Sequence, residues 1–266
     1  MTQKMNTVLA AVEHSTATVN RLVSDYTRFF KDKGGAFLGI KKTYSPREGY
    51  PDDPTKTGTT LVTTTVDEKI DWAEKILKDH FKNVFTVEAT NSLGAPTVEL
   101  VVEGQSFGNL TALELMRLKS ILTNKEFETM YSSIPVRSDA EVWNPSDDPD
   151  YTGRNVFETE LVKGVAKTTE TEEVILKDPN LDPQHLPSNY NAKVTTKRKI
   201  AEIGDYTMQK FSGEWNHRQR AELLRRRSVL LEAVIKALKE VNDVQAAEPN
   251  LDVEKFVNYI HRGTVK

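Results

Sequence analysis

One segment of this sequence has the spacing of a serine nucleophile. Gly104-Gln105-Ser106-Phe107-Gly108 matches the G-x-S-x-G pattern, in which the serine lies at a sharp turn between a strand and a helix. A strand is expected before this segment and a helix after it. The expected strand carries Glu99 and Glu103, which predicts one solvent-exposed face, whereas the strand before a nucleophile elbow is buried. The segment is therefore interpreted as a glycine-flanked turn, with a serine hydrolase at Ser106 as the third of the functions that the sequence suggests.

Acidic and histidine residues give little indication of a metal site. Asp147, Asp148 and Asp150 could hold a hard cation through their oxygens, but Pro149 interrupts them and no glutamate follows at the spacing of a calcium loop. The histidines are scattered and the chain has no cysteine. We expect no metal site and no cofactor, and we interpret the aspartates as a solvated turn.

The strongest charge cluster lies on the clearest helix of the chain, residues 216–243. Apolar residues at steps of three and four give this helix a wide hydrophobic face that must be buried. Asn216 is the expected N-cap, and Gln219 is placed to reach back to it. Positive side chains near a helix N-terminus are unfavourable unless carboxylates or other anions lie against them. The arginines concerned are Arg218, Arg220, Arg225, Arg226 and Arg227.

These arginines have three interpretations. They can form an interface with carboxylates of the acidic strands expected before the helix, within or between protomers. They can contact nucleic acid, together with neighbouring cationic residues and a tryptophan for base stacking. They can also be a solvated helix face. The carboxylates of the first interpretation are Glu158, Glu160, Glu170, Glu172 and Glu173, and the neighbouring residues of the second are Lys197, Arg198, Lys199 and Trp215.

The distribution of charge favours the interface. The net charge is −3, but residues 139–182 contain twelve acidic and four basic residues, and residues 193–227 contain ten basic and four acidic residues. Two adjacent blocks of opposite sign most simply neutralise each other. This weakens a direct inference to nucleic acid.

The composition is that of a globular protein, with 38% hydrophobic and 28% charged residues among 266. No apolar run approaches the roughly 18 residues of a membrane span, and the first 33 residues have an amphipathic pattern unlike a signal peptide. We therefore expect a cytoplasmic protein without a membrane partner.

The periodicity predicts an α+β fold, with an antiparallel β-meander or hairpins packed against long amphipathic helices near both termini. Residues 1–133 form a helical and hairpin half, which makes one domain with a β-meander and the arginine-rich helix in residues 134–243. Residues 244–266 form a linker and a short C-terminal interaction helix. The expected helices are 7–33, 65–82, 111–122, 125–132, 216–243 and 251–261. The expected strands are 61–64, 84–90, 97–103, 155–163, 165–176, 192–203 and 206–211. The rest of residues 36–65 is expected to be irregular, and a hairpin turn is expected at 204–205.

The short C-terminal helix exposes Phe256, Val257 and Ile260. A helix of this length is marginal alone, so it must dock on its own domain or on another subunit.

Three short segments occur in an order that resembles a known family. They are Gly39-Ile40 with Thr43-Tyr44 and Pro46, then Ile134-Pro135 with Asp139-Ala140-Glu141 and Trp143, then Lys210-Phe211-Ser212-Gly213 before the long helix. The chain thereby resembles a family of uncharacterised hypothetical proteins, mainly from actinobacteria and phages. It departs from that pattern in the long connection at 178–190 and in the tail beyond Asn242. The resemblance implies the order of the segments and no activity.

Together these features predict a non-enzymatic cytoplasmic protein that self-associates into a homo-oligomer or larger assembly. The partner is then a second copy of the chain. The alternative is a nucleic-acid-binding accessory protein that uses the arginine-rich helix.

Overall fold

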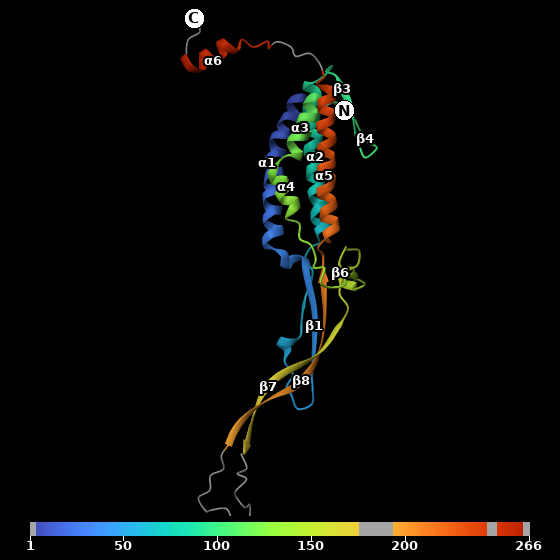
Figure 1. Ribbon diagram of the computed structural model, residues 1–266, viewed down its shortest axis with the longest axis vertical. Helices are drawn as coiled ribbons and strands as arrows, with labels where there is room; N and C mark the ends of the chain where they lie inside the picture. Colours follow the sequence, from blue (N-terminus) through green and yellow to red (C-terminus); the bar gives the residue numbers. More distant parts are fainter. Residues whose placement is uncertain (1–3, 176–193, 244–248, 263–266) are drawn as a thin grey trace, which may run out of the picture. The chain divides into compact units, whose positions relative to one another are not determined.

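The computed structural model describes residues 4–175, 194–243 and 249–262, and these residues form an α+β fold (Figure 1). The α+β prediction is confirmed. The predicted connection at 178–190 and most of the predicted linker after Asp243 lie outside the described residues.

The helices are α1 (Met5–Asp32), α2 (Val66–Asn91), α3 (Ala112–Leu122), α4 (Lys125–Ser132), α5 (His217–Val241) and α6 (Val253–Arg262), with short 3-10 helices η1 (Gly34–Phe37), η2 (Pro54–Lys56) and η3 (Pro149–Tyr151). The strands are β1 (Leu38–Pro46), β2 (Gly58–Thr60), β3 (Thr97–Val102), β4 (Gln105–Thr111), β5 (Asn144–Pro145), β6 (Phe157–Glu158), β7 (Val162–Ile175) and β8 (Val194–Ser212).

The chain divides into two compact units. The first, here called the helical unit, consists of Met1–Val23, Leu77–Tyr131 and Glu222–Lys266. The second, the sheet unit, consists of Ser24–Ile76 and Ser132–Ala221. Each unit combines segments from distant parts of the sequence. The predicted division at residues 133 and 243 stays a prediction.

The predicted capping residues begin three of the helices. Thr65 and Glu68 exchange hydrogen bonds before α2, because Glu68 N donates to Thr65 Oγ1 at 3.1 Å and Thr65 N donates to Glu68 Oε2 at 3.0 Å. Thr111 forms the same capping box at α3. Asn216 and Gln219 exchange two bonds of 2.8 Å at α5, which confirms the predicted N-cap.

Residues 84–90 were predicted to be a strand, and this prediction is wrong, because they belong to α2. Past its buried first residue, Val66, the buried positions of this helix are Ala73, Leu77, His80, Val84 and Glu88, which recur every three or four residues. Two of the five are polar, so the buried stripe is not visible as an apolar period. The short apolar alternation at 85–89 dominates the local pattern instead.

The hairpin that follows α2 is β3–β4, whose two strands meet at Glu103 and Gly104. Both turn residues have positive φ, 49° and 83°, as a tight two-residue hairpin turn requires. One face of this hairpin packs on α3 and α5 in the core of the helical unit. The buried members of that core are Leu100, Leu115, Val234, Ala237, Leu238 and Val241.

The main sheet has the strand order β2-β1-β8-β6-β5, with β7 also paired to β8. All its pairings are antiparallel. Residues 36–65 were predicted to be mostly irregular, which is wrong, because β1 pairs with β8 from Leu38–Ser212 to Pro46–Gly204. The predicted strand at 61–64 is also displaced, since β2 ends at Thr60.

The hairpin turn predicted at Gly204–Asp205 is absent, because β8 runs as one strand through both residues. Gly204 has a different role in this strand. A Cβ atom at this position would lie 2.3 Å from Cε2 of the buried Tyr44 ring. The glycine therefore allows the Tyr44 ring to pack closely against the strand. A glycine needed for close packing and a glycine needed for a turn look the same in the sequence.

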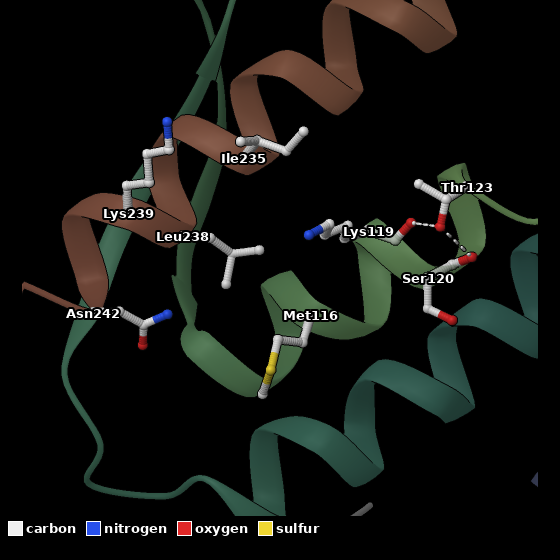
Figure 2. Close-up of a pocket in the computed structure, with 8 residues that line it drawn as sticks. All are labelled: Met116, Lys119, Ser120, Thr123, Ile235, Leu238, Lys239 and Asn242. Atoms are coloured by element: carbon white, nitrogen blue, oxygen red, sulfur yellow. Dashed lines mark hydrogen bonds between the residues drawn. The ribbon is translucent and has the colours of Figure 1, made fainter. Parts of the chain in front are cut away.

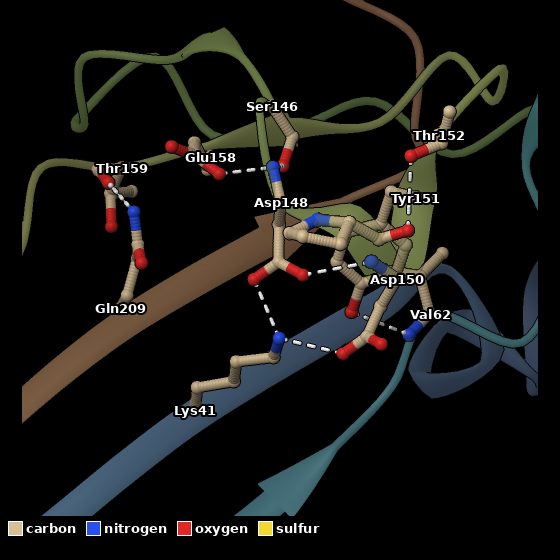
Figure 3. Close-up of polar contacts among 11 residues, drawn as sticks. Lys41, Val62, Ser146, Asp148, Asp150, Tyr151, Thr152, Glu158, Thr159 and Gln209 are labelled. Carbon is tan, nitrogen blue, oxygen red and sulfur yellow. Dashed lines mark hydrogen bonds and ion pairs between the residues drawn. The ribbon is translucent and has the colours of Figure 1, made fainter.

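The sheet unit has its own apolar core, made by Val62, Tyr151, Val156 and Phe211. The Tyr151 hydroxyl accepts a hydrogen bond from Val62 N at 3.2 Å, and the Tyr151 and Phe211 ring centroids are 5.0 Å apart. This core holds the segment after β5 against the sheet, and Figure 3 shows the hydrogen bond between Tyr151 and Val62.

Candidate functional site

Ser106 does not lie at a nucleophile elbow. It is inside β4, an exposed strand of an antiparallel hairpin, and its Oγ donates to Glu99 Oε1 at 2.5 Å. Gly104 and Gly108, the two glycines of the G-x-S-x-G pattern, both have positive φ. The glycines serve the hairpin backbone, and the predicted strand–turn–helix context is corrected to strand–turn–strand.

Two of the three clustered aspartates contact a lysine. Lys41 Nζ on β1 lies 2.5 Å from Asp148 Oδ2 and 2.7 Å from Asp150 Oδ2 (Figure 3). The ammonium group lowers the pKa of Asp148 below its ordinary value, and the two carboxylates raise the pKa of Lys41. Lys41 thus occupies the position of a cation beside these carboxylates. Among the residues that the structure describes, no group of three or more His, Asp or Glu side chains could hold a metal ion.

Two of the α5 arginines pair with carboxylates of their own unit. The Arg225 guanidinium contacts two carboxylates, that of Glu222 at 2.8 Å and that of Glu103 in the β3–β4 turn at 2.7 Å. Arg226 lies 2.9 Å from Glu222. The two guanidinium groups lower the pKa of Glu222 to about 2. Neither contact involves the acidic strand residues that we predicted as partners.

Two further arginines bind backbone carbonyl groups. Arg220 Nη1 donates to Ile134 O at 2.9 Å, and Arg227 Nη2 donates to Leu122 O at 2.9 Å. The Arg227 guanidinium also lies 5.1 Å from the centroid of the Tyr131 ring. Arg218, the remaining member of the cluster, is exposed. The positive charge of α5 is therefore largely engaged within the protomer.

The acidic and basic blocks meet as neighbouring strands, β7 and β8. The register places Glu170 opposite Lys199 and Glu172 opposite Lys197. The Glu170 carboxylate also accepts a hydrogen bond from Tyr50 Oη at 2.8 Å. The predicted meeting of opposite charges thus occurs across a strand pair in one chain, with lysines of β8 opposite the glutamates.

The other predicted interface carboxylates differ in their surroundings. Glu158, on β6, is half-buried and accepts a hydrogen bond from Ser146 Oγ at 2.5 Å. Glu160 and Glu173 are exposed. Glu158 therefore has a structural role, and the other two are available to a partner.

Trp215, predicted to stack on bases, is held by the sheet unit. Its Nε1 donates to Asp67 Oδ1 at 2.6 Å, and its carbonyl oxygen accepts from Arg137 N at 2.8 Å. The indole is half-buried. These contacts give Trp215 a structural function.

The outer part of the β7–β8 pair is a two-stranded ribbon. β1 stops pairing with β8 at Gly204, and β7 and β8 continue through nine further pairs, from Lys167–Glu202 to Ile175–Val194. In the described part of the chain, no third strand pairs with this stretch. We call these nine pairs the outer ribbon (Figure 1).

One face of the outer ribbon combines apolar and charged side chains. Alternation places Ile200, Arg198 and Val194 on this face from β8, and Glu173 from β7. Ile200 is 69% exposed and Val194 is 54% exposed. An apolar surface flanked by both charge signs is therefore open to solvent in the single chain.

The C-terminal helix α6 has a second exposed apolar face. Val253, Phe256, Val257 and Ile260 recur at helical spacing, and all four are exposed. The prediction that Phe256, Val257 and Ile260 are exposed is confirmed.

A groove lies between α3 and α5 in the helical unit, with a volume of about 630 Å³. Met116 of α3 and Ile235 and Leu238 of α5 supply its apolar walls, and Lys119 and Lys239 lie at its rim (Figure 2). Thr123 Oγ1 donates to Lys119 O at 2.9 Å, which fixes the end of α3. The groove can accept an apolar helix face with nearby acidic residues.

The sequence interpretation missed a polar cluster inside the helical unit. Ser15 Oγ and His80 Nδ1 lie 2.7 Å apart, and Arg117 lies 2.6 Å from Glu88. Burial lowers the pKa of His80, and the charge of Arg117 acts in the same direction. His80 and Glu88 lie eight residues apart on one face of α2, a spacing that was visible in the sequence once the helix was extended past residue 82.

Comparison with protein families identifies a family for this chain. The model of a family of unknown function, DUF7873, matches residues 2–263. No curated protein and no solved structure matches the chain. The predicted resemblance to an uncharacterised family is confirmed. Among the described residues, none of the helices has both the length and the apolar character needed to cross a bilayer.

Proposed function

Because this chain belongs to DUF7873, a family of unknown function, no activity transfers to it, and we propose from its own surfaces that it is a non-enzymatic self-associating protein of the cytoplasm. Association uses the outer ribbon and α6. The predicted role of the α5 arginines is thereby reduced, because four of the five have contacts within the chain.

The observation that carries the proposal is the outer ribbon. An isolated two-stranded ribbon is marginally stable in water, and a third strand or a covering surface is needed to stabilise it. This ribbon instead exposes Ile200 and Val194 and leaves both of its edges unpaired in the described chain. A partner that covers the apolar face would supply the missing burial.

A second copy of the chain is the partner that fits this face. Arg198 and Glu173 lie on the same face, on opposite strands and two positions apart along the ribbon. A two-fold axis between two such faces can place Arg198 of each copy against Glu173 of the other, with Ile200 next to these charge pairs. Self-complementary contacts of this kind are the usual basis of a symmetric dimer.

Helix α6 supports the same proposal. Ten residues are too few for a stable isolated helix, so the apolar face requires a partner surface. We assign it to the groove between α3 and α5 of a second copy. Glu254 and Asp252 near the start of α6 complement Lys119 and Lys239 at the rim of the groove.

Nucleic acid is the weaker alternative for the ribbon. Lys197, Arg198 and Lys199 are exposed, but residues 167–175 and 194–202 contain four basic and four acidic side chains in total. A surface without net positive charge gains little from phosphate neutralisation.

Light scattering at low salt tests the proposal. The native chain is expected to have a mass of at least twice 30.0 kDa. Arg198→Glu and Glu173→Arg should each weaken association, because the substituted face then carries like charges that repel. An equimolar mixture of the two variants should restore it, because each contact regains one positive and one negative partner. A native chain that stays monomeric at high concentration would refute the proposal, as would variants that associate normally.

A truncated chain that ends at Asp243 tests the role of α6. If α6 binds a second copy, the truncation lowers the association constant. If the truncated chain associates normally but melts at a lower temperature, α6 docks on its own chain and that part of the proposal is wrong. Absorbance at 260 nm in the same measurements reports any bound nucleic acid.

A further inference from the structure

The sheet unit contains a pocket that the proposed assembly does not use. Its volume is about 580 Å³, which is in the range of sites for small organic ligands. Leu38 and Ile40 of β1 and Lys210 of β8 form one wall, and Val136 and Trp143 of the segment before β5 form another. Three stretches that are far apart in the sequence thus meet at one cavity.

The pocket walls are mostly apolar and are fixed by hydrogen bonds. Trp143 Nε1 donates to Ser138 O at 2.8 Å, which holds the tryptophan side chain at the pocket. β1 and β8 are paired through Ile40–Lys210 and Leu38–Ser212. An apolar ligand body would therefore enter a cavity that is already formed, without the cost of ordering its walls.

The charged groups of the lining are two carboxylates and one ammonium group, Glu141, Glu214 and Lys210. Lys210 Nζ contacts Glu141, so these two charges neutralise each other. The Glu214 carboxylate remains, and it accepts a hydrogen bond from Ser212 Oγ at 3.2 Å. The lining therefore has a net negative charge at Glu214.

The surroundings of Glu214 disfavour its charged form. Burial raises the pKa of its carboxyl group, and the Ser212 hydroxyl and the charge of Arg137 oppose this in part. Arg137 itself lies 3.6 Å from the centroid of the Phe157 ring, and its Nη1 donates to the backbone oxygen of Glu214 at 3.2 Å. A ligand cation at the carboxylate would stabilise the charged form.

We propose that this pocket binds a small organic cation, in which an ammonium or guanidinium group contacts the Glu214 carboxylate and an aliphatic or aromatic body fills the apolar cavity. An anionic ligand would meet two carboxylates and only one ammonium group that is already paired. A neutral ligand would leave the Glu214 carboxylate with only the charge of Arg137, which is not among the residues that line the pocket. The chemistry of the lining therefore selects a cation.

Calorimetric titration of the full chain with three probes of similar size tests this proposal. They are 2-phenylethylammonium, 2-phenylethanol and 3-phenylpropionate, which differ in charge. The ammonium probe is expected to bind at least about tenfold more tightly than the alcohol, as a hydrogen bond between charged groups implies, and the carboxylate probe is expected not to bind. This comparison needs no substitution in the protein.

Variants locate the binding. Glu214→Gln should reduce the affinity for the ammonium probe to that for the alcohol, while Glu48→Gln, an exposed carboxylate outside the lining, should leave it unchanged. Val136→Phe should weaken binding of both probes, because it fills the cavity without a change of charge. Thermal melts by circular dichroism show that each variant is folded.

Three results would overturn the proposal. The first is no binding of the ammonium probe at about 10 mM, roughly four orders of magnitude above a dissociation constant of about 1 μM. The second is equal affinity for ammonium and alcohol. The third is an unchanged affinity in folded Glu214→Gln. None of these results depends on the oligomeric state of the chain.

Discussion

The strand pairs β3–β4 and β7–β8 differ in what covers them. β3–β4 lies against α3 and α5, and Leu100 at its centre is 1% exposed. The outer ribbon of β7–β8 has Ile200 at a comparable position on its face, and that side chain is 69% exposed. Both strand pairs are antiparallel, and they differ in side-chain burial.

The comparison shows why we assign the intermolecular contact to the ribbon. Burial of an apolar side chain contributes about 1.5–3 kcal/mol, and β3–β4 obtains that contribution within its own unit. The outer ribbon lacks it in the single chain. The loop after β1 contacts the inner half of the ribbon and its junction with the sheet, through Arg47 with Glu202 and Asp205 and through Tyr50 with Glu170.

The largest expected effect is a difference in the free energy of unfolding between a substitution in β3–β4 and one in the outer ribbon. Leu100→Ala should lower the free energy of unfolding by about 2–5 kcal/mol, because it leaves a cavity in a packed core. Ile200→Ala, measured in dilute solution where the chain is monomeric, should change it by less than about 0.5 kcal/mol. Urea denaturation measures both. A large loss for Ile200→Ala at high dilution would show that the ribbon is covered within its own chain.

A smaller effect is expected at the junction between the sheet and the ribbon. Gly204→Ala places a methyl group where the buried Tyr44 ring lies, and such overpacking costs about 1–3 kcal/mol. Gly58→Ala is the matched control, because no atom lies within 4 Å of its added Cβ. Thermal melts of the two variants compare them. Equal melting temperatures would mean that Tyr44 can move and that the junction is not tightly packed.

The acid stability of the sheet unit should depend on Lys41. The pKa of Asp148 is lowered in the folded state, so its contribution to stability is present above the ordinary aspartate value of 3.8 and is lost as the pH falls through the lower folded pKa. Lys41→Met removes the main cause of this shift. Urea midpoints between pH 2 and pH 6 should fall less steeply with acid in the variant. Parallel curves for the two proteins would contradict this assignment.

The smallest effect is expected for the exposed ion pairs of Arg225, which join α5 to the β3–β4 turn. Arg225→Gln removes the contacts with Glu103 and Glu222, but these groups are solvated and such pairs contribute little. We expect a slight decrease of the melting temperature at low salt. The decrease should vanish at about 0.5 M salt, because dissolved ions then screen exposed charges over a few ångströms. Arg218→Gln on the same helix is the control. A large loss at high salt would show that Arg225 has a packing role.

Local signals in the sequence predicted the helical elements well. Reciprocal capping pairs at Thr65, Thr111 and Asn216 identified the starts of α2, α3 and α5, because a cap is formed by residues three positions apart. The strand predicted over residues 165–176 likewise covers most of β7. These features depend on neighbours in the chain, so no knowledge of the fold was needed.

The misses arise where a distant contact decides the conformation. Residues 84–90 alternate like a strand, but His80 and Glu88 are buried through contacts with Ser15 and Arg117, and the helix continues. Gly204 resembles a turn residue until Tyr44 is placed against it. The candidate sites follow the same rule. The exposed α6 face was predicted, whereas the partners of the α5 arginines and the pocket at Glu214 were not.

The sequence by itself determined the starts of α2, α3 and α5 at their caps, the opposite charges of the β7 and β8 segments, and the apolar face of α6, since all of these depend on residue type and short spacing. The tertiary structure alone decided that β1 pairs with β8, that Lys41 lies between Asp148 and Asp150, and that the outer ribbon has no third strand in the described chain. The physical reason is that strand pairing and side-chain burial join residues more than a hundred positions apart, and a local pattern does not encode which distant segment supplies the partner.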